Sequence, residues 1–255
     1  MLIKVHCDES SDKHKEYILS IGAVMSFVDD ENIVGISDGE RAWQQRLNHD
    51  GIAYFHASDC ESLKGEFDLQ KLGGLSSARA IIDSLGCDLR GIIKQFNFLG
   101  IGASILISDF NKVINQYPQA REYYGSDPKV AVCKTLIKAT IEWLNKDRPD
   151  LSHLPVSFLF DDYSGYLEAE KAYVELRGTA LYGDRLGTIG HGDDKKIPAL
   201  QMGDLMAYEA RYETLRHLKE KDTERYMFNK LWQNNSVYSF ILMNESGMLR
   251  ELGIK

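Results

Sequence analysis

The sequence predicts an α/β protein in which helices flank a mixed β-sheet. Two strand patterns open the chain, because residues 2–8 alternate apolar and polar side chains and residues 17–28 are almost continuously apolar. Later strand patterns alternate with helical ones, most clearly in 129–144, where Val130, Cys133 and further apolar residues recur on one helix face. Strands first, and then strands alternating with helices, are typical of a mixed sheet covered by helices.

The first two strands are expected to pair as a hairpin. In 2–8, Ile3, Val5 and Cys7 share one face, while Asp8 ends the strand and opens a turn that reaches Asp12. The segment 17–28 is rich in β-branched residues, which favours a strand buried in the middle of the sheet.

The rest of the chain is assigned by the same periodicities. The expected elements are a polar connection 29–38, a helix 39–49, a short strand 52–59, a loop 62–75, a helix 76–95, a strand 98–107, helices 109–117 and 129–144, a strand 156–160, a helix 166–176, a segment 186–192 with room for a short strand, a helix 198–218, and short helices 223–232 and 245–252.

Composition indicates a globular protein outside the membrane. The chain has 255 residues, 44% of them hydrophobic and 27% charged, which is enough for a substantial core. No apolar run approaches the length of a membrane span, and the start lacks the pattern of a signal peptide. The four cysteines are widely spaced, which suits reduced thiols. We therefore expect a cytoplasmic protein without membrane contact.

The net charge of −8 argues mildly against a protein that coats nucleic acid by neutralising many phosphates. It leaves room for a metal-dependent nuclease, because acidic metal ligands and a separate basic rim can coexist with a negative net charge.

The stretch 198–209 contains the first residue that asks for a functional explanation. Pro198 suits the first turn of a helix, and Asp204 then shares a stripe with apolar residues such as Leu200. A carboxylate in such surroundings must be protonated, paired or bound to a metal ion. The plain alternative is an ion pair at the edge of the stripe, with Arg211 or with a neighbour from another element.

Three acidic residues stand out by position. Asp8 and Asp161 follow predicted strands, where open α/β sheets usually build sites, and Asp204 lies on the late helix. If the three converge, their repulsion requires a cation, and a hard ion such as Mg²⁺ or Mn²⁺ suits oxygen ligands. Two such ions about 4 Å apart can promote phosphodiester cleavage. Spacing alone leaves their convergence open.

Each acidic residue also has a plainer interpretation. Asp8 could cap the turn after its strand. Asp161 and Asp162 point to opposite faces, so only one is expected in the site, and we choose Asp161. Glu9 and Asp162 are expected to be solvent-exposed or to support the ligands from behind.

Three other polar residues are candidates for substrate chemistry. His56 could move a proton near the metal, or it could be a hydrogen-bonded histidine in a turn. Lys195 and Lys196 could contact a phosphate, although most such lysine pairs are simply solvated. Tyr123 and Tyr124 are expected to be packing residues.

Four segments in order resemble the "domain of unknown function 3800" family, which is related to the ribonuclease H-like nucleases. They are Asp8-Glu9-Ser10, 54–59, 160–162 and 198–205, so the resemblance covers most of the chain. It implies a single ribonuclease H-like domain over 1–255, with 29–97 as a largely helical insertion that shapes the site.

The same resemblance implies that Asp8, Asp161 and Asp204 are metal ligands. One departure is Gly203, where the family pattern leads us to expect Ala; glycine should loosen the helix slightly without removing the ligand. Some members of the family are suspected in phage or plasmid conflict, and a shared fold does not by itself establish activity.

These observations favour a nuclease that hydrolyses phosphodiesters of DNA or RNA with carboxylate-bound Mg²⁺ or Mn²⁺. A second hypothesis is a non-catalytic, partner-binding or regulatory protein on the same fold. A third is a glycoside hydrolase with a carboxylate pair, ranked last because aromatic sugar platforms are not evident.

Overall fold

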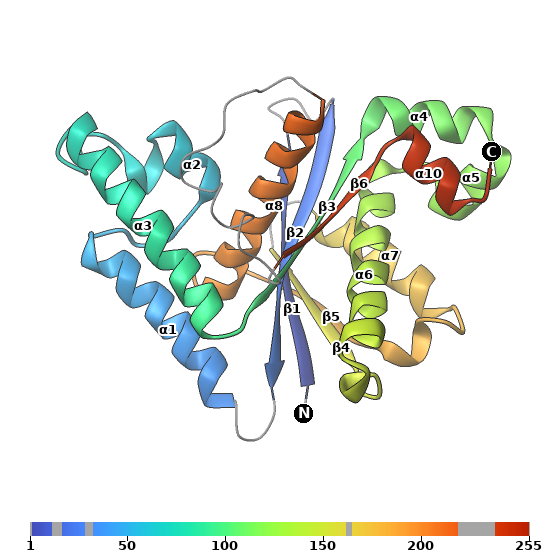
Figure 1. The fold of residues 1–255 in the computed structure, drawn as a ribbon, viewed down its shortest axis with the longest axis horizontal. Helices are drawn as coiled ribbons and strands as arrows, with labels where there is room; N and C mark the ends of the chain where they lie inside the picture. The colour runs from blue at the N-terminus through green and yellow to red at the C-terminus, as the bar shows by residue number, and fades with distance from the viewer. Residues whose placement is uncertain (1, 12–16, 29–32, 162–164, 219–237, 255) are drawn as a thin grey trace.

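A six-stranded mixed sheet forms the centre of the protein (Figure 1). The computed structural model describes residues 2–11, 17–28, 33–161, 165–218 and 238–254. The strand order is β5-β4-β1-β2-β3-β6. Strands β1, β2 and β3 form an antiparallel meander, whereas β4 runs parallel to β1, β5 parallel to β4, and β6 parallel to β3. The predicted mixed α/β sheet flanked by helices is confirmed.

The described elements follow in chain order. They are β1 (Leu2–Ser11), β2 (Ile18–Val28), α1 (Ile33–His49), α2 (Ala57–Ser62), a 3-10 turn (Gly65–Phe67), α3 (Leu75–Gln95), β3 (Leu99–Leu106), α4 (Ile107–Gln116), α5 (Pro118–Tyr124), α6 (Pro128–Asp147), a 3-10 turn (Pro149–Leu151), β4 (Val156–Asp161), α7 (Tyr166–Arg177), a 3-10 turn (Gly183–Arg185), β5 (Leu186–Gly192), α8 (Pro198–His217), β6 (Tyr238–Met243) and α10 (Glu245–Glu251).

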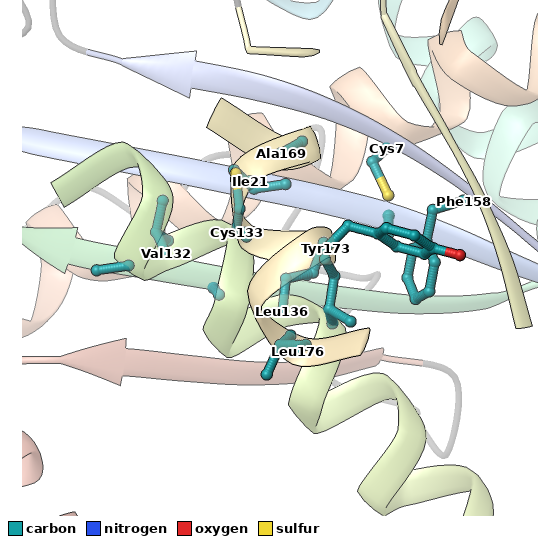
Figure 2. Close-up of a cluster of buried hydrophobic side chains, with 14 of the residues drawn as sticks. Cys7, Ile21, Val132, Cys133, Leu136, Phe158, Ala169, Tyr173 and Leu176 are labelled. Atoms are coloured by element: carbon teal, nitrogen blue, oxygen red, sulfur yellow. The ribbon is translucent and has the colours of Figure 1, made fainter. Parts of the chain in front are cut away.

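Alternation along the strands divides the core between the two faces of the sheet. Ile3, Val5 and Cys7 of β1 face α6 and α7, and Figure 2 shows Cys7 and Phe158 in this cluster beside side chains of both helices. The opposite face is covered by α8, with α1, α2 and α3 outside it (Figure 1). None of the described helices combines the length and apolar character that a bilayer crossing needs.

Helix α8 is buried on all sides in its first half. Every residue from Ala199 to Ala210 is buried, because the helix lies between the sheet and the outer layer of α1 and α3. Its closest approach to the sheet is at Gly22 of β2, where an added Cβ would come 1.8 Å from the backbone nitrogen of Ala207. Glycine at this position lets the helix backbone contact the strand directly.

The predicted turn after Asp8 is wrong, because β1 continues to Ser11. Residues 8–11 of the predicted turn pair with β2 instead, with Asp8 opposite Gly22 and Ser11 opposite Leu19, while Asp12 lies outside the described residues. Hairpin hydrogen bonding to a buried partner strand outweighs the turn preference of Asp and Ser. Asp8 therefore lies inside a strand rather than at its end.

The predicted strand 52–59 is also wrong. Residues 52–56 form no regular element, and α2 begins at Ala57. The backbone N–H groups of Phe55 and Ala57 donate to side chains of α8, so this segment is held by a helix and not by a strand. The following loop, 62–75, contains the 3-10 turn Gly65–Phe67.

Besides α2, two helices or strands were not predicted from the sequence, namely α5 (Pro118–Tyr124) and β6 (Tyr238–Met243). Helix α1 begins at Ile33, earlier than expected, and the short strand in 186–192 is present as β5. The predicted helix 223–232 lies outside the described residues.

Candidate functional site

Asp8 and Asp161 lie at neighbouring positions on adjacent parallel strands. Cys7 of β1 is opposite Phe160 of β4. Asp8 and Asp161, the next residues on these two strands, are therefore also neighbours. Because Cys7 and Phe160 face α6, the side chains of Asp8 and Asp161 point to the face that α8 covers. Asp162, the alternative to Asp161, lies outside the described residues.

Asp204 reaches the same region from α8, and only 3% of its surface is exposed. The preceding residue, Gly203, packs against β1, since an added Cβ would lie 3.0 Å from the carbonyl oxygen of His6 and 3.3 Å from the Asp8 nitrogen. The expectation that this glycine merely loosens the helix is therefore corrected. Gly203 allows the close approach that brings Asp204 beside Asp8.

A backbone group holds the Asp204 carboxylate. Its Oδ2 atom accepts a hydrogen bond of 2.6 Å from the N–H of Ala57, at the start of α2. Arg211, the alternative partner considered from the sequence, instead donates to the carbonyl of Ser11 at 2.5 Å, and its guanidinium lies 4.7 Å from the centre of the Tyr208 ring. The ion pair between Arg211 and Asp204 is not formed.

The pKa values show that the carboxylates act on one another. The pKa of Asp8 is raised well above 3.8, first by burial of its carboxyl group and then by the negative charges of Asp204, Asp161 and Asp194; the N–H of Glu9, 2.6 Å from Asp8 Oδ1, opposes this. The residue Asp8 keeps some accessible surface, but its carboxyl group is desolvated.

The pKa of Asp204 is raised to about 6, again mainly by burial. The charge of His56 and the hydrogen bond from Ala57 lower this pKa, whereas the charges of Asp194 and Asp161 raise it. Acidic groups from β1, β4, α8 and the segment before α8 thus share one electrostatic environment.

Asp194 is the member of this group that the sequence reasoning missed. Its N–H donates to Asp161 Oδ1 at 3.1 Å, and its carbonyl accepts from Gln201 Nε2 at 2.8 Å. Burial and the charge of Asp161 raise its pKa. A signal was present, because Asp194 follows the end of β5 just as Asp161 ends β4.

His56 has the contacts expected of a histidine in a turn, and its role in proton transfer stays a prediction. It precedes α2, and its Nδ1 lies 3.3 Å from Asp59 Oδ2, as expected for a histidine in a turn. Its charge also lowers the pKa of both Asp204 and Asp194, which places it beside the carboxylates. About 40% of its side chain is exposed, so it is accessible to a substrate.

The two lysines lie on the surface near this group. The Lys195 ammonium is 5.2 Å from the centre of the Tyr54 ring, and the Lys196 ammonium pairs with Asp193 at 2.8 Å. Glu9 projects from the other face of β1 toward Gly165, the residue directly before α7, where an added Cβ would lie 3.2 Å from Glu9 Oε2. Glu9 therefore lies next to the aspartates but on the opposite face of the sheet.

The donor chemistry of this group fits a hard divalent cation. All of its donors are oxygen atoms, and burial together with the negative charge of neighbouring carboxylates raises the pKa of Asp8, Asp194 and Asp204. A cavity of about 20 Å³, enough for one water-sized particle, is lined by Asp8, Glu9, Ile21, Phe160, Asp161 and Gly165. Within the described part of the chain, no three His, Cys, Asp or Glu side chains are arranged to hold a metal ion as they stand.

Comparisons with known proteins add little to this geometry. No family model matches the sequence, and a search of curated proteins gives no match. Among solved structures, 98% of this chain aligns with 86% of a chain from "Structure of the PCNA:RNase HII complex from Archaeoglobus fulgidus", with 16% sequence identity and a TM-score of 0.37. A similarity of this size assigns neither a family nor an activity.

Proposed function

We propose that this chain is a metal-dependent nuclease built as a single ribonuclease H-like domain over residues 1–255, with 29–97 as an insertion that shapes the site. The observation that carries the proposal is the position of three aspartates. Asp8 and Asp161 directly follow the paired residues Cys7 and Phe160 on parallel strands, and the buried Asp204 of α8 is near enough for its charge, with that of Asp161, to act on Asp8. Carboxylates that destabilise one another in this way favour a cation between them.

Asp8, Asp161 and Asp204 would hold Mg²⁺ or Mn²⁺. Such an ion, when bound, supplies a Lewis acid that lowers the pKa of water and offsets negative charge on a phosphate. The protein's own part is positioning: the N–H of Asp194 orients Asp161, and the N–H of Ala57 orients Asp204. Ala57 is the first residue of α2, and Asp194 follows the end of β5.

The exposed groups around the carboxylates would bind and protonate the substrate. His56, half-exposed near Asp204 and Asp194, would give a proton to the leaving oxygen. Lys195 and Lys196, at the surface before α8, would contact phosphates. Glu9 and Asp162 flank the ligands in sequence and would support them.

The substrate in this proposal is DNA or RNA, and the protein would act in the cytoplasm. A role in phage or mobile-element conflict belongs to the same proposal and rests only on the resemblance of the four sequence segments to the "domain of unknown function 3800" family. The negative net charge of −8 fits a protein that contacts few phosphates at a time.

Cleavage of labelled DNA, RNA and hybrid duplexes tests the proposal. Wild type, Asp204→Asn and Asp150→Asn would be compared with Mg²⁺, with Mn²⁺ and with chelator. Asp150 is an exposed carboxylate in the 3-10 turn Pro149–Leu151, so its substitution controls for the loss of a charge. We expect metal-dependent cleavage by wild type and Asp150→Asn, and a loss of at least about 100-fold in Asp204→Asn. Absence of cleavage of every substrate by wild type would contradict the proposal.

A further inference from the structure

A second, larger cavity lies away from the acidic group. Its volume is about 660 Å³, which is within the range of small-molecule sites. Its walls come from α5, α6, the end of α7, the segment 179–182 and Leu252, and none of them contributes to the aspartate group. In Figure 1 the helices α5, α6 and α7 lie on the side of the sheet opposite α8.

Apolar and aromatic side chains form part of the wall of this cavity. Leu176, Leu252 and three tyrosines contribute to the lining. Leu181 and Tyr123 are 69% and 43% exposed, and both belong to the lining. Large apolar side chains left in water beside a cavity are a feature of ligand sites. Tyr123 was expected to be a packing residue, and its ring does pack edge-on against Tyr124, with the ring centres 4.9 Å apart, although it also borders the cavity; Tyr124 is buried as expected.

The two lysines on the cavity wall are already neutralised. Lys134 pairs with Glu175, and Lys138 pairs with Glu251 at 2.6 Å. Glu251 also accepts hydrogen bonds from Tyr123 at 2.8 Å and, through its second oxygen, from Tyr124 at 2.7 Å. These ammonium groups are therefore held by fixed partners and are poorly available to an anion.

Carboxylates outnumber cations around the cavity. Glu122 lines it and forms no ion pair with any residue that the structure describes, and Glu142 accepts a hydrogen bond of 2.5 Å from Tyr182. Counting the lining residues and these direct partners, four carboxylates (Glu122, Glu142, Glu175, Glu251) face two ammonium groups (Lys134, Lys138), which leaves two negative charges. The excess favours a cationic ligand.

We propose that this cavity binds a small organic cation, an ammonium group carried on an apolar or aromatic body. Leu181, Leu252 and the ring of Tyr123 would contact the body. Glu122 and the half-exposed carboxylate of Glu175 would accept from the ammonium group, as charge-assisted hydrogen bonds. This inference is independent of the nuclease proposal, because the two sites share no residue.

Isothermal titration calorimetry with three probes of one shape tests the inference. The probes are 2-phenylethylammonium, the neutral 2-phenylethanol and the anionic 3-phenylpropanoate. We expect the cation to bind about tenfold more tightly than the alcohol and the anion to bind most weakly. No heat of binding from the cation at millimolar concentration, or equal or tighter binding of the alcohol or the anion, would overturn the inference.

Variants locate the binding. Glu122→Gln and Tyr123→Ala change exposed side chains, so both should fold, and each should weaken binding of the cation by about threefold to tenfold. Asp83→Asn, an exposed carboxylate on α3 at the other side of the sheet, should leave binding unchanged. Equal affinity of wild type, Glu122→Gln and Tyr123→Ala would show that the cation binds elsewhere and would refute this assignment.

Discussion

Asp204 Oδ2 and the backbone N–H of Ala57 form a hydrogen bond of 2.6 Å that ties the buried half of α8 to the start of α2. The two residues are 147 positions apart in sequence, and the bond fixes both the carboxylate and the segment that carries His56. Together with the bond from the Phe55 N–H to Gln201, it keeps two N–H groups of 52–59 on α8 and away from a β-ladder.

Two substitutions of Asp204 should therefore have different effects on stability. Asp204→Leu leaves the N–H of Ala57 without an acceptor in a buried place, and should lower the free energy of unfolding by about 1–3 kcal/mol. Asp204→Asn keeps an acceptor and removes a desolvated charge, so at pH 7 it should be at least as stable as wild type. Urea unfolding of both variants measures the difference, and a less stable Asp204→Asn would argue against this account of the bond.

The pH dependence of stability should also follow Asp204. Its pKa in the folded protein is about 6, against an ordinary 3.8, so the folded state binds its proton more tightly than the unfolded state does. The stabilisation is fully present below pH 3.8 and is lost as the pH rises through about 6. At about 1.4 kcal/mol per pKa unit, wild type should lose on the order of 3 kcal/mol relative to Asp204→Asn between pH 4 and 7. If the difference in the free energy of unfolding between wild type and Asp204→Asn stayed the same from pH 4 to pH 7, the raised pKa of Asp204 would be contradicted.

Gln201 joins three segments through one fully buried side chain. Its Oε1 accepts from Trp43 Nε1 at 2.9 Å and from the N–H of Phe55 at 3.0 Å, while its Nε2 donates to the carbonyl of Asp194 at 2.8 Å. Gln201→Leu should lower the free energy of unfolding by about 2–4 kcal/mol, because it leaves these groups unpaired. A Gln201→Leu variant as stable as wild type in urea unfolding would count against this role.

The close contact between α8 and the sheet depends on two glycines. Gly22→Ala should be severely destabilising, since its Cβ would meet the backbone of α8 at 1.8 Å, and Gly203→Ala should be milder, with a contact of 3.0 Å. Gly91, exposed in α3 with open space around it, is the matched control, and Gly91→Ala should stabilise by up to about 1 kcal/mol. Thermal unfolding of the three variants should follow this order; a tolerated Gly22→Ala would contradict the packing described for α8.

Local periodicity was sufficient to predict most elements of the fold. The long amphipathic helices α3 and α6 and the buried strand β2 were assigned correctly because their apolar patterns are strong. The failures occur where distant contacts decide the structure. The end of β1 is held by β2, the segment before α2 by side chains of α8, and β6 by parallel pairing with β3.

The candidate site was predictable in part for the same reason. Asp161 could be singled out from a strand end and Asp204 from a helix stripe, whereas Asp8 was chosen from a strand end that the structure does not have, and the sequence could not show that the three are neighbours. Asp194 was missed because it stands in a charged run, Asp193 to Lys196, that has the composition of a solvated turn. The low helix propensity of Gly203 suggested a slightly loosened helix. Its role is instead to let α8 approach β1 closely, which only the tertiary structure shows.

Calorimetric titration with Mn²⁺ tests most directly the claim that these aspartates form one cation site. Wild type, Asp8→Asn, Asp204→Asn and the neighbouring control Asp193→Asn would be titrated at pH 6, close to the pKa of Asp204. We predict binding with release of protons by wild type and Asp193→Asn, and affinity at least about tenfold weaker in the other two. No binding by wild type, or the same affinity in all four proteins, would contradict the central claim.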